Sequence, residues 1–331
     1  MFSIAESLSK NNEVTVFWDD RDILKKASER FGLSLEKVTV VKNIFKDSSL
    51  PRKIAKTLSY DKIIYLSDGS VPLISPQKLL LHFQVPIIKK NVPSIQRLKV
   101  RLARRVFCNS QFTKKIIDNT YGIDSLILYP PVKEFEYSEK KKQNLILTVG
   151  RFQPFENDTD FKKISFMIDA FKKLKERKGW KFKIITVVSK EYDEKFKKLK
   201  EKENENIEII KNVDLNTVKD AYNTAKIYWH AAGFGEDVEA YPERMEHFGI
   251  STVEAMSAGC VPVVINMGGQ KEIVNEKCGY LWDTESELLD FTQKVMTDEN
   301  LRIKLAKESK RVSQKFSAEN FKNNLERIVE S

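Results

Sequence analysis

Residues 246–264 read EHFGISTVEAMSAGCVPVV, and no other segment of the chain combines so many special residue types. Two carboxylates, Glu246 and Glu254, flank the aromatic-glycine pair Phe248-Gly249, and the segment closes on a run of β-branched residues. Glycines and small polar residues mark turns and helix ends, whereas a short apolar β-branched run favours a buried strand. The segment therefore predicts a loop, then a helix, then a buried strand.

The middle of this segment has the signals of a short helix. Gly249 frees the backbone before it, Ser251 and Thr252 favour a helix start, and Gly259 is a natural C-terminal stop. A helix of about ten residues after a glycine has unpaired N–H groups in its first turn, and together with its dipole these form an anion site. The two carboxylates then contact different parts of one ligand. The alternative is a capped amphipathic helix with solvated acids, which is the commoner outcome for a random pair of glutamates.

Length and charge bound the kind of protein. A chain of 331 residues is long enough for two domains with cores of their own, and 41% apolar residues is typical of globular proteins. The formal net charge is +10. This excess favours an anionic partner such as a phosphorylated substrate, a lipid surface or nucleic acid.

The cysteines and the lack of long apolar runs indicate the compartment. Cys108, Cys260 and Cys278 lie far apart in apolar settings, which favours reduced core thiols in a cytoplasmic protein over a disulfide framework or a zinc site. No apolar run has the length of a membrane span, and residues 1–10 lack the features of a signal peptide. We expect a protein that is soluble or bound at a membrane surface.

Short β-branched runs alternate with helical patterns along the whole chain. Such alternation predicts an α/β fold with parallel sheets covered by helices on both sides. In the first half the expected strands are residues 14–17, 38–41, 62–66, 79–83, 106–108 and 126–128, and in the second half they are residues 145–149, 182–188, 207–210, 227–229 and 261–265.

The best domain boundary lies near the middle of the chain. Tyr129-Pro130-Pro131 is followed by a polar, largely charged run before a new strand begins. We expect one Rossmann-like domain at residues 1–135 and a second at 136–316. Ser317 is expected to cap a terminal helix at residues 317–331, which packs back on the first domain.

The amino-terminal segment departs from this pattern. Residues 1–10 already have a helical pattern, so the first sheet opens without the strand that normally precedes such a helix. We expect a truncated start to the first domain, and in-frame coding sequence upstream of Met1 would support this expectation.

A second cluster of candidate ligand-binding residues follows the strand expected at residues 145–149. Gly150 and Arg151 come at its end, and Lys162 opens the next helix. Ligands bind at the carboxyl ends of parallel strands in such sheets. A guanidinium suits two-pronged contact with a diphosphate and an ammonium suits a point contact, although a helix-surface lysine alone is usually solvated. The three residues predict a diphosphate-binding site.

Together these motifs resemble the retaining glycosyltransferases of family 4, which have the two-domain GT-B fold. The resemblance covers most of the chain, although family members usually begin with a strand and a glycine-rich loop before the helix that residues 1–10 match. The form of residues 246–249 and the insertion-like residues 233–244 are more weakly similar to a mannosyltransferase branch that elongates polyprenyl-linked oligosaccharides. The residues that carry the family resemblance are Gly150-Arg151, Lys162, Ala170-Phe171, Glu246, Phe248-Gly249, Glu254-Ala255-Met256, Gly259, Pro262-Val263-Val264, Gly268-Gly269 and Glu272-Ile273-Val274, with Asn109-Ser110, Tyr129-Pro130-Pro131-Val132 and His82-Phe83 in the first half.

The resemblance implies roles for these residues. Arg151 and Lys162 hold the donor diphosphate, so that leaving-group charge is stabilised without a metal. Glu246 binds hydroxyls of the transferred sugar, and Glu254 binds the ribose. The second domain is then the nucleotide-sugar-binding domain and the first lies on the acceptor side. The remaining donor-binding residues implied are Gly150, Phe248, Gly249, Ile250 and Ser251.

His82 is the remaining catalytic candidate. A histidine near a strand end is more often structural, but the resemblance implies that His82 faces the cleft and bonds the donor sugar or the reacting oxygens. His230 and His247 receive no role. The three histidines are too scattered for a metal motif, and no metal or cofactor is expected beyond the nucleotide-sugar donor, such as a GDP- or UDP-hexose.

The segment at residues 95–106 is a candidate membrane contact. It carries Arg97, Lys99, Arg101, Arg104 and Arg105 between apolar residues, so that a helix there has a basic face beside an apolar one. Two interpretations stay open, either contact with an anionic membrane at the cytoplasmic face or an apolar side packed on the sheet with a solvated basic face.

Two further motifs are discounted. The acidic run at residues 19–22 follows an early strand and is better interpreted as a helix cap than as a metal site. Nucleic acid is not an expected partner, because aromatic residues do not alternate with basic ones as a stacking platform requires.

The sequence therefore predicts a metal-independent, retaining transferase. It moves a hexose, with mannose favoured by the weaker resemblance, from a nucleoside diphosphate to a glycan or polyprenyl-linked acceptor. The alternative is a non-catalytic or inactive GT-B protein, or a fragment, that binds a nucleotide sugar or an anionic partner without transfer.

Overall fold

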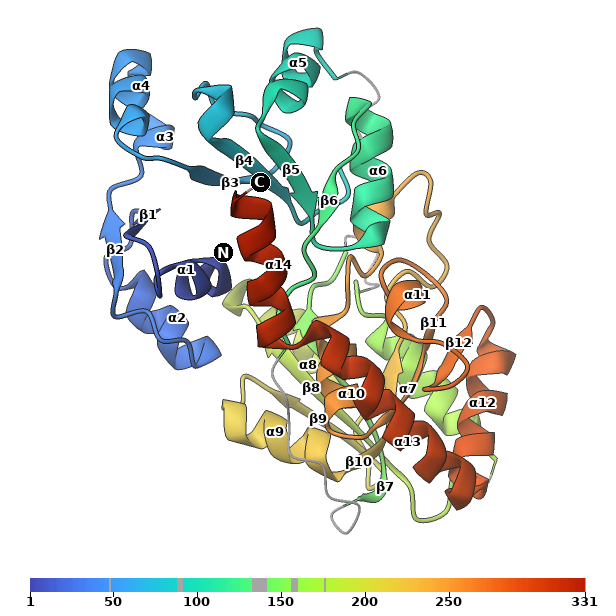
Figure 1. Ribbon diagram of the computed structural model, residues 1–331. Helices are drawn as coiled ribbons and strands as arrows, with labels where there is room; N and C mark the ends of the chain where they lie inside the picture. The colour runs from blue at the N-terminus through green and yellow to red at the C-terminus, as the bar shows by residue number, and fades with distance from the viewer. Residues whose placement is uncertain (48, 88–91, 133–141, 156–159, 176, 331) are drawn as a thin grey trace. The chain divides into compact units, whose positions relative to one another are not determined.

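The structure is a computed structural model that describes all residues except 48, 88–91, 133–141, 156–159, 176 and 331 (Figure 1). The chain forms two compact units, which are described separately below. Unit 1 comprises Met1–Pro131 and Ala318–Ser331, and unit 2 comprises Val132–Ser317. The expected domain boundary between residues 135 and 136 lies outside the described residues.

Unit 2 is built on one six-stranded parallel sheet with the strand order β12-β11-β10-β7-β8-β9. The first strand of the unit, β7, lies in the middle, so the chain builds outward on one side and then on the other. This arrangement is a doubly wound sheet, and its switch point lies between β7 and β10. The strands are β7 (Gln143–Phe152), β8 (Lys181–Val188), β9 (Ile207–Lys211), β10 (Ala225–His230), β11 (Val261–Ile265) and β12 (Tyr280–Trp282).

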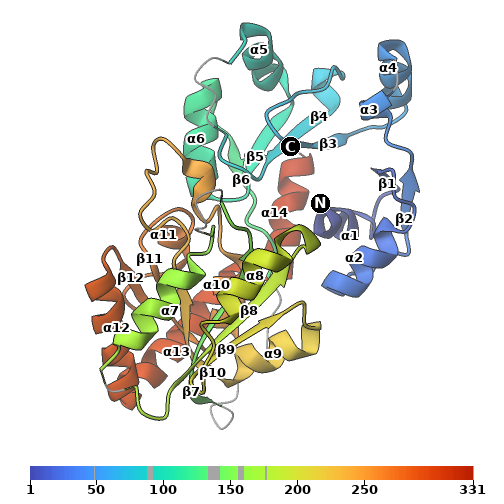
Figure 2. The same ribbon diagram turned by 180° about the vertical axis from the view of Figure 1, so that it is seen from behind.

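Helices cover this sheet on both sides, as Figures 1 and 2 show together. On one side, α7 buries Ile164, Ile168 and Phe171, whose spacing places them on one helix face. The helices are α7 (Ile164–Lys173), α8 (Asp193–Lys200), α9 (Leu215–Thr224), α10 (Ile250–Ser257), α11 (Gln270–Ile273), α12 (Glu285–Thr297) and α13 (Glu299–Ser313), with 3₁₀ turns η3 (Lys190–Tyr192), η4 (Pro242–Arg244) and η5 (Gln314–Phe316).

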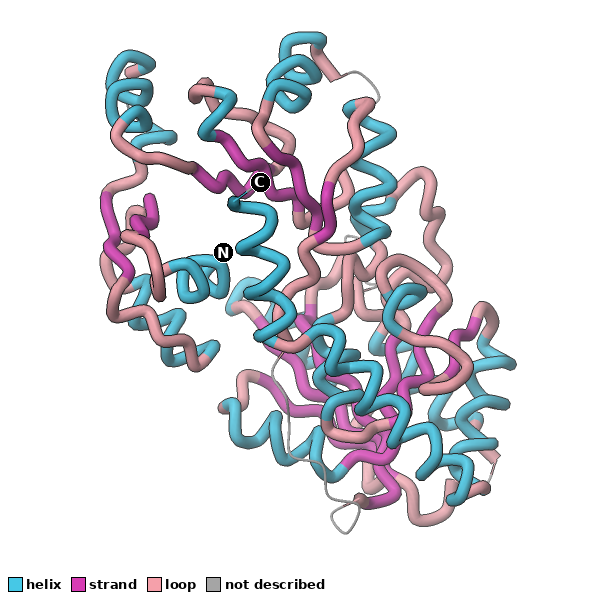
Figure 3. The backbone as a smooth tube through the Cα atoms, in the orientation of Figure 1, coloured by secondary structure: helices cyan, strands magenta, loops and turns pink. Residues whose placement is uncertain are grey.

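Unit 1 contains two separate parallel sheets, whose strands are magenta in Figure 3. One pairs β1 (Val14–Phe17) with β2 (Val38–Val41). The other has the strand order β3-β4-β5-β6 and consists of β3 (Ile63–Ser67), β4 (Leu79–Phe83), β5 (Arg105–Cys108) and β6 (Leu126–Ile127).

The terminal helix belongs to unit 1, where it closes a small core. Its residues Phe321, Leu325 and Ile328 pack with Ile4 of the first helix and with Leu80 of β4. The helices of this unit are α1 (Phe2–Leu8), α2 (Ile23–Phe31), α3 (Ile44–Asp47), α4 (Leu50–Leu58), α5 (Ser94–Leu102), α6 (Gln111–Tyr121) and α14 (Ala318–Glu330), with the 3₁₀ turn η1 (Pro76–Lys78).

The structure confirms each expected strand to within a few residues, and it also confirms the opening helix α1 and the terminal helix α14. Two expectations were wrong. The last strand expected from the sequence is residues 261–265, but the three-residue strand β12 adds a further edge to the sheet. Arg151 does not follow its strand but lies within it, since β7 continues to Phe152 in register with β8.

Candidate functional site

The candidate site of unit 2 lies at the switch point of its sheet. The carboxyl end of β7 carries Gly150 and Arg151, and the neighbouring strand β10 ends on His230. Ligands of doubly wound sheets bind in the crevice outside these strand ends. The topology therefore brings residues from distant parts of the sequence to one edge of the sheet.

The loop before α10 owes its shape to three glycines. Gly249 begins α10 with φ +117°, a conformation that L side chains rarely adopt. The amide of Gly269 donates to the carbonyl of Glu246 at 2.7 Å, and a Cβ on Gly269 would lie 2.5 Å from the backbone of Phe248. A Cβ on Gly268 would lie 2.3 Å from the carbonyl oxygen of Glu246. The loop 246–249 thus packs backbone to backbone on the Gly268-Gly269 turn.

The helix itself has eight residues rather than the expected ten or so. Gly259 follows it with φ +75°, which confirms the expected C-terminal stop. The structure differs at the other end, where the helix start has no side-chain cap. Ser251 instead places its Oγ 2.8 Å from Oη of Tyr228. Among the described residues, no acceptor is found for the amide groups of Ile250 and Ser251, as expected for a first helical turn.

Glu246 is the centre of a largely buried charged cluster. Its Oε2 atom forms an ion pair with Nζ of Lys162 and lies 2.8 Å from Nε2 of His230. The three side chains come from the loop before α10, the turn before α7 and the end of β10. The structure therefore brings together two of the predicted catalytic residues, and it adds His230, for which no role was predicted.

The cluster fixes the charge of each acid-base group in it. Burial alone raises the pKa of the Glu246 carboxyl, but the charge of Lys162 and the contact with His230 outweigh it and hold that pKa well below its ordinary value. Burial, with the charge of Lys162, lowers the pKa of His230. His230 is therefore neutral and donates its Nε2 proton to an ionised Glu246.

Lys162 owes its position to a tight turn and a glycine. The buried carboxylate of Asp160 accepts from the amides of Lys162 at 3.0 Å and Ile164 at 2.9 Å, which fixes the start of α7. A Cβ on Gly150 would lie 2.9 Å from Cε of Lys162. The missing side chain at residue 150 thus makes room for the lysine stem beside β7.

Lys163, which follows Lys162 in the turn before α7, supports the other end of the loop at residues 236–246. Lys163 has φ +56°, which is rare for a residue with a side chain, and forms an ion pair with Glu236. Arg244 Nη1 binds the second oxygen of Glu236 at 2.8 Å, and its guanidinium lies over the Tyr241 ring. Residues 236–246 are therefore held at both ends by two consecutive lysines.

Arg151 differs from these residues because its side chain is exposed. In the part of the chain that the structure describes, no partner of its guanidinium is found. Since Gly150 and Arg151 alternate along β7, Lys162 approaches the strand over the glycine while the arginine extends from the other side.

Glu254 lies in a separate environment from Glu246. Its Oε2 atom accepts a hydrogen bond of 3.0 Å from Oη of Tyr222, a fully buried residue of α9. Tyr228 on β10 donates a hydrogen bond of 3.2 Å from its Oη atom to the carbonyl of Val149. The expected division of the two carboxylates between different surroundings is thus present in the fold.

Phe248 and Ile250 differ in exposure at the start of α10. Phe248 is buried, and its ring packs edge-on against Phe316 at 5.2 Å. Ile250 is 46% exposed. The Phe248 side chain therefore anchors the loop in the core, and only its backbone is available to a ligand.

His82 lies in unit 1, on β4, and is described apart from the other candidates. Its ring is only 4% exposed and stacks on Phe107 at 4.4 Å. Neither ring nitrogen has a partner among the described residues. Burial, with the nearby amino-terminal charge, lowers the pKa of His82 to about 3. The implied role of His82 in bonding the donor sugar or the reacting oxygens stays a prediction.

Four residues of the site were missed in the sequence. His230, Tyr222 and Tyr228 each precede a turn or lie inside a regular element, where nothing marks them as different from core residues. Gln270 is fully buried, and neither of its side-chain polar atoms has a partner in the described chain. A Cβ on Gly249 would lie 2.7 Å from Nε2 of Gln270. Its place directly after Gly268-Gly269 is the one signal that could have identified it.

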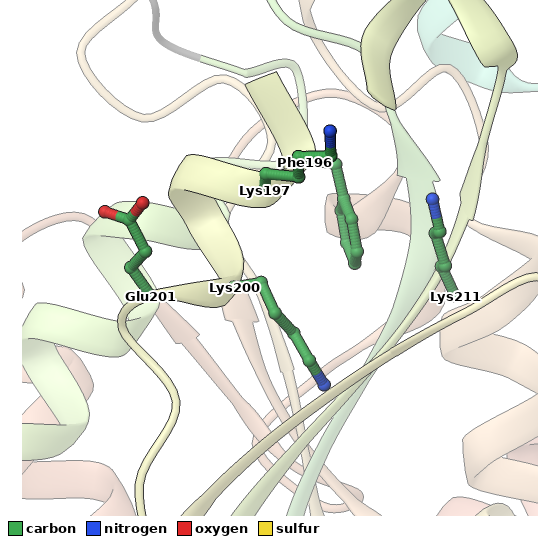
Figure 4. A pocket seen from close by; sticks show the side chains of 5 residues that line it. All are labelled: Phe196, Lys197, Lys200, Glu201 and Lys211. Carbon is green, nitrogen blue, oxygen red and sulfur yellow. The ribbon is translucent and has the colours of Figure 1, made fainter. Parts of the chain in front are cut away.

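A surface depression elsewhere in unit 2 is not part of this site. It lies between α8 and β9 and is lined by lysines and Phe196 (Figure 4). Lys200 binds Glu203 and Lys211 binds Asp193, and Lys211 also lies over the Phe196 ring. These lysines already have acidic partners on the protein.

Several features outside the site relate to the sequence expectations. The three cysteines are free and buried, as expected. Asp22 is at the N-cap position of α2, but its side chain makes no cap hydrogen bond, and the amide of Asp22 instead donates to Oδ1 of Asp20 at 3.0 Å. In the described ranges, no group of three His, Cys, Asp or Glu side chains is placed to hold a metal ion. No helix among the described residues is long and apolar enough to cross a membrane.

Unit 2 is defined by its doubly wound sheet and by the charged cluster at the switch point as a ligand-binding α/β domain. The family model for glycosyl transferases group 1 matches residues 131–312, more than half of the chain. The chain therefore belongs to the glycosyl transferases group 1 family, which confirms the family resemblance seen in the sequence.

The chain is also similar to two curated mannosyltransferases. The Dictyostelium discoideum protein "GDP-Man:Man(3)GlcNAc(2)-PP-Dol alpha-1,2-mannosyltransferase" is 23% identical over 220 residues, which are 61% of this chain and 41% of that protein. Human "Alpha-1,3/1,6-mannosyltransferase ALG2" is 24% identical over 261 residues, 71% of this chain and 60% of the human protein. The chain thus spans about half the length of these relatives.

Solved structures confirm the fold over the whole chain. Anabaena Alr3699/HepE, in complex with UDP and glucose, has a TM-score of 0.71 at 16% identity and covers 99% of this chain and 94% of its own. A glycosyltransferase from Rickettsia africae has a TM-score of 0.71 at 14% identity, with 100% and 94% covered. The predicted GT-B class is therefore confirmed.

Proposed function

We propose that this protein is a retaining, metal-independent glycosyltransferase. It moves a hexose, which we propose to be mannose, from a nucleoside diphosphate to a glycan or polyprenyl-linked acceptor. One observation carries the proposal: Glu246, Lys162 and His230 meet at the switch point of the sheet, beside the amino end of α10.

The charges around this point suit a departing diphosphate. Lys162 is a partly buried cation, Arg151 is an exposed cation at the carboxyl end of β7, and the first amides of α10 are further hydrogen-bond donors. Fixed donors and cations that meet developing negative charge lower a transition state without a metal. In our proposal Arg151 and Lys162 bind the diphosphate with the backbone of Gly249, Ile250 and Ser251.

In our proposal the two carboxylates bind different parts of the donor. Glu246, kept ionised by Lys162 and His230, accepts hydrogen bonds from the hydroxyls of the transferred sugar. Glu254, fixed by Tyr222, accepts from the ribose hydroxyls. We assign no covalent step to either acid. The acceptor hydroxyl attacks the face from which the diphosphate leaves, the old glycosidic bond to phosphate breaks, and the leaving phosphate takes the acceptor's proton.

We also propose a ligand-binding role for His82 of unit 1. Its two ring nitrogens are the only polar groups of its side chain, and both are without partners in the described chain. Leaving a buried polar group unpaired costs about 1–3 kcal/mol, so such a group is usually kept for a purpose. A hydrogen bond to a bound ligand would supply the missing partner.

Donor identity is proposed from the relatives. The Dictyostelium protein is named for GDP-mannose and for a pyrophosphate-linked lipid acceptor, whereas the Anabaena structure contains UDP and glucose. The similarity to named mannosyltransferases favours GDP-mannose. We further propose that the protein works at the cytoplasmic face of a membrane, where a polyprenyl-linked acceptor would be held.

Calorimetric titration with GDP, UDP and ADP, followed by product analysis, tests the proposal. We expect GDP to bind with EDTA present, and the Arg151→Ala variant to bind it much more weakly. NMR of the product should show the anomeric configuration of the donor. Tight nucleotide binding without any transfer would support the non-catalytic alternative, and an inverted product or complete loss of transfer in EDTA would contradict the mechanism.

A further inference from the structure

The net charge of the protein is concentrated in one segment. Of the 57 Lys and Arg residues, ten lie between Gly69 and Ile117, where the sequence has no Asp or Glu. The remaining 47 basic residues are balanced by the 47 acidic residues of the chain, so the whole formal charge of +10 comes from this segment. It includes β4, α5 and β5 of unit 1. A local excess of this size creates a field that attracts anionic surfaces.

Within this segment, α5 presents its apolar side outward. Ile95, Leu98 and Leu102 recur at the spacing of one helix face and are 59%, 50% and 52% exposed. Val100 is the one residue of the helix that is fully buried, and it lies on the opposite side. The interpretation in which α5 packs its apolar side on the sheet is therefore wrong for these three residues.

Cations flank this exposed stripe. Lys99 donates to the carbonyl of Val71 at 3.3 Å, and Nε of Arg101 donates to the carbonyl of Tyr121 at 3.1 Å. These bonds fix the two stems on either side of the stripe, while Arg97 is exposed. An apolar centre between fixed cations matches the interface of an anionic bilayer, whose acyl boundary lies beneath a charged headgroup layer.

A second helix of unit 1 has the same feature. On α4, Leu50, Ile54 and Leu58 are spaced by four residues and are 49%, 38% and 57% exposed. The helix sequence contains basic residues but no acidic one.

The two helices are linked through η1 and lie at the same end of unit 1 in both ribbon views (Figures 1 and 2). Lys78 donates to the carbonyl of Leu58 at the end of α4, and the carbonyl of Pro76 accepts from the amide of Arg104, just after α5.

We propose that α4 and α5 form a docking surface for an anionic lipid membrane, with Ile95, Leu98 and Leu102 entering the headgroup boundary. An apolar stripe of this exposure is unusual in a monomer that stays in water. A nucleic-acid surface would instead present aromatic side chains between the cations, and neither helix contains one. The inference does not depend on the transfer reaction, because membrane binding is measured without donor or acceptor.

Flotation with vesicles tests this surface. The full chain should bind vesicles of phosphatidylcholine with 30 mol% phosphatidylglycerol, roughly tenfold or more tightly than pure phosphatidylcholine. The Leu98→Glu variant should lose about tenfold in partitioning, because a charge replaces the centre of the stripe. The matched control is Leu126→Glu, which changes an apolar residue of 41% exposure in the same unit outside both helices and should bind like the wild type.

Reversal of one exposed charge tests the electrostatic part. Arg97→Glu should weaken binding to anionic vesicles severalfold and leave the weak binding to neutral vesicles unchanged. Lys198→Glu, an exposed lysine on α8, is its control. Unchanged thermal unfolding would show that the variants remain folded. Equal binding of Leu98→Glu and wild type, or a wild-type dimer that Leu98→Glu dissociates without any vesicle binding, would overturn the proposal.

Discussion

Nε2 of His230 lies 2.8 Å from Oε2 of Glu246, inside the buried cluster that also holds Lys162. The histidine is 1% exposed, so it contacts a ligand only through the carboxylate. It acts as a positioning residue, because it fixes the rotamer of Glu246 and leaves the second carboxylate oxygen available.

Replacing His230 should therefore affect transfer more than binding. His230→Phe keeps most of the ring volume but removes the bond, and we expect kcat to fall about 100-fold, since a small misplacement of a reacting group has that effect. His230→Gln, which still offers an amide donor, should recover most of the rate. The acidic limb of the pH–rate profile should move to higher pH in the Phe variant, because Glu246 loses a bond that lowers its pKa. A purely structural role would lower thermal stability without this shift.

Replacement of Lys162 should lower both the stability of the protein and its affinity for nucleotide, whereas replacement of Arg151 should lower the affinity alone. Lys162→Met leaves Glu246 without its cation in a site where that carboxylate is 16% exposed, and removal of one partner from a buried pair costs about 3 kcal/mol or more. Arg151→Ala removes an exposed side chain and should change the free energy of unfolding by less than about 0.5 kcal/mol. Both should weaken nucleotide binding. Chemical denaturation and calorimetric titration of each variant check the contrast, and an unstable Arg151→Ala would count against it.

Gly150 should matter only through Lys162. In Gly150→Ala the new Cβ would lie 2.9 Å from Cε of the lysine, so the stem must move from its place beside β7. We expect weaker nucleotide binding in Gly150→Ala, and no further loss when Ala replaces Gly150 in the Lys162→Ala background. The measurement is a double-mutant cycle on the dissociation constant. Additive losses would show that the glycine serves another purpose.

His82 should make the protein sensitive to acid. Its pKa is about 3 in the folded chain and 6.5 ordinarily, so the unfolded chain binds the extra proton first. The stabilising effect of keeping His82 neutral is complete above about pH 6.5 and is lost as the pH falls toward 3. His82→Leu removes this dependence. The difference between the unfolding free energy of the variant and that of the wild type should therefore increase in favour of the variant as the pH falls from about 7 to about 4. Parallel curves for the two proteins would contradict the burial of a neutral ring.

Most of the fold could be predicted from the sequence because the strands are short apolar runs, most of them rich in β-branched residues. The run at residues 261–265 is buried throughout and was placed to the residue. Tyr280–Trp282 was missed because three residues are too few to establish a period. The end of β7 was placed too early because a glycine suggested a stop, whereas Gly150 continues in register with Thr186.

The site was harder to predict because its supporting residues look like core residues. Glu246 and Lys162 carry charges in unusual settings, and this made them visible. His230 closes the strand AKIYWH, and Tyr222 lies inside a helix, so only the strand order reveals that they meet the two acids. Gly268 and Gly269 were noted as part of a motif, but their purpose depends on the backbone of residues 246–248, which no local pattern reports.

The most direct test of the proposed transferase is release of GDP from GDP-mannose in the presence of a polyprenyl-linked glycan acceptor and EDTA. The wild-type protein should release GDP and lengthen the acceptor together, and Glu246→Gln should bind GDP normally but transfer at least about 100-fold more slowly, because it loses its grip on the sugar and not on the diphosphate. Equal transfer by the Glu246→Gln variant and the wild type would contradict the role of the Glu246, Lys162 and His230 cluster.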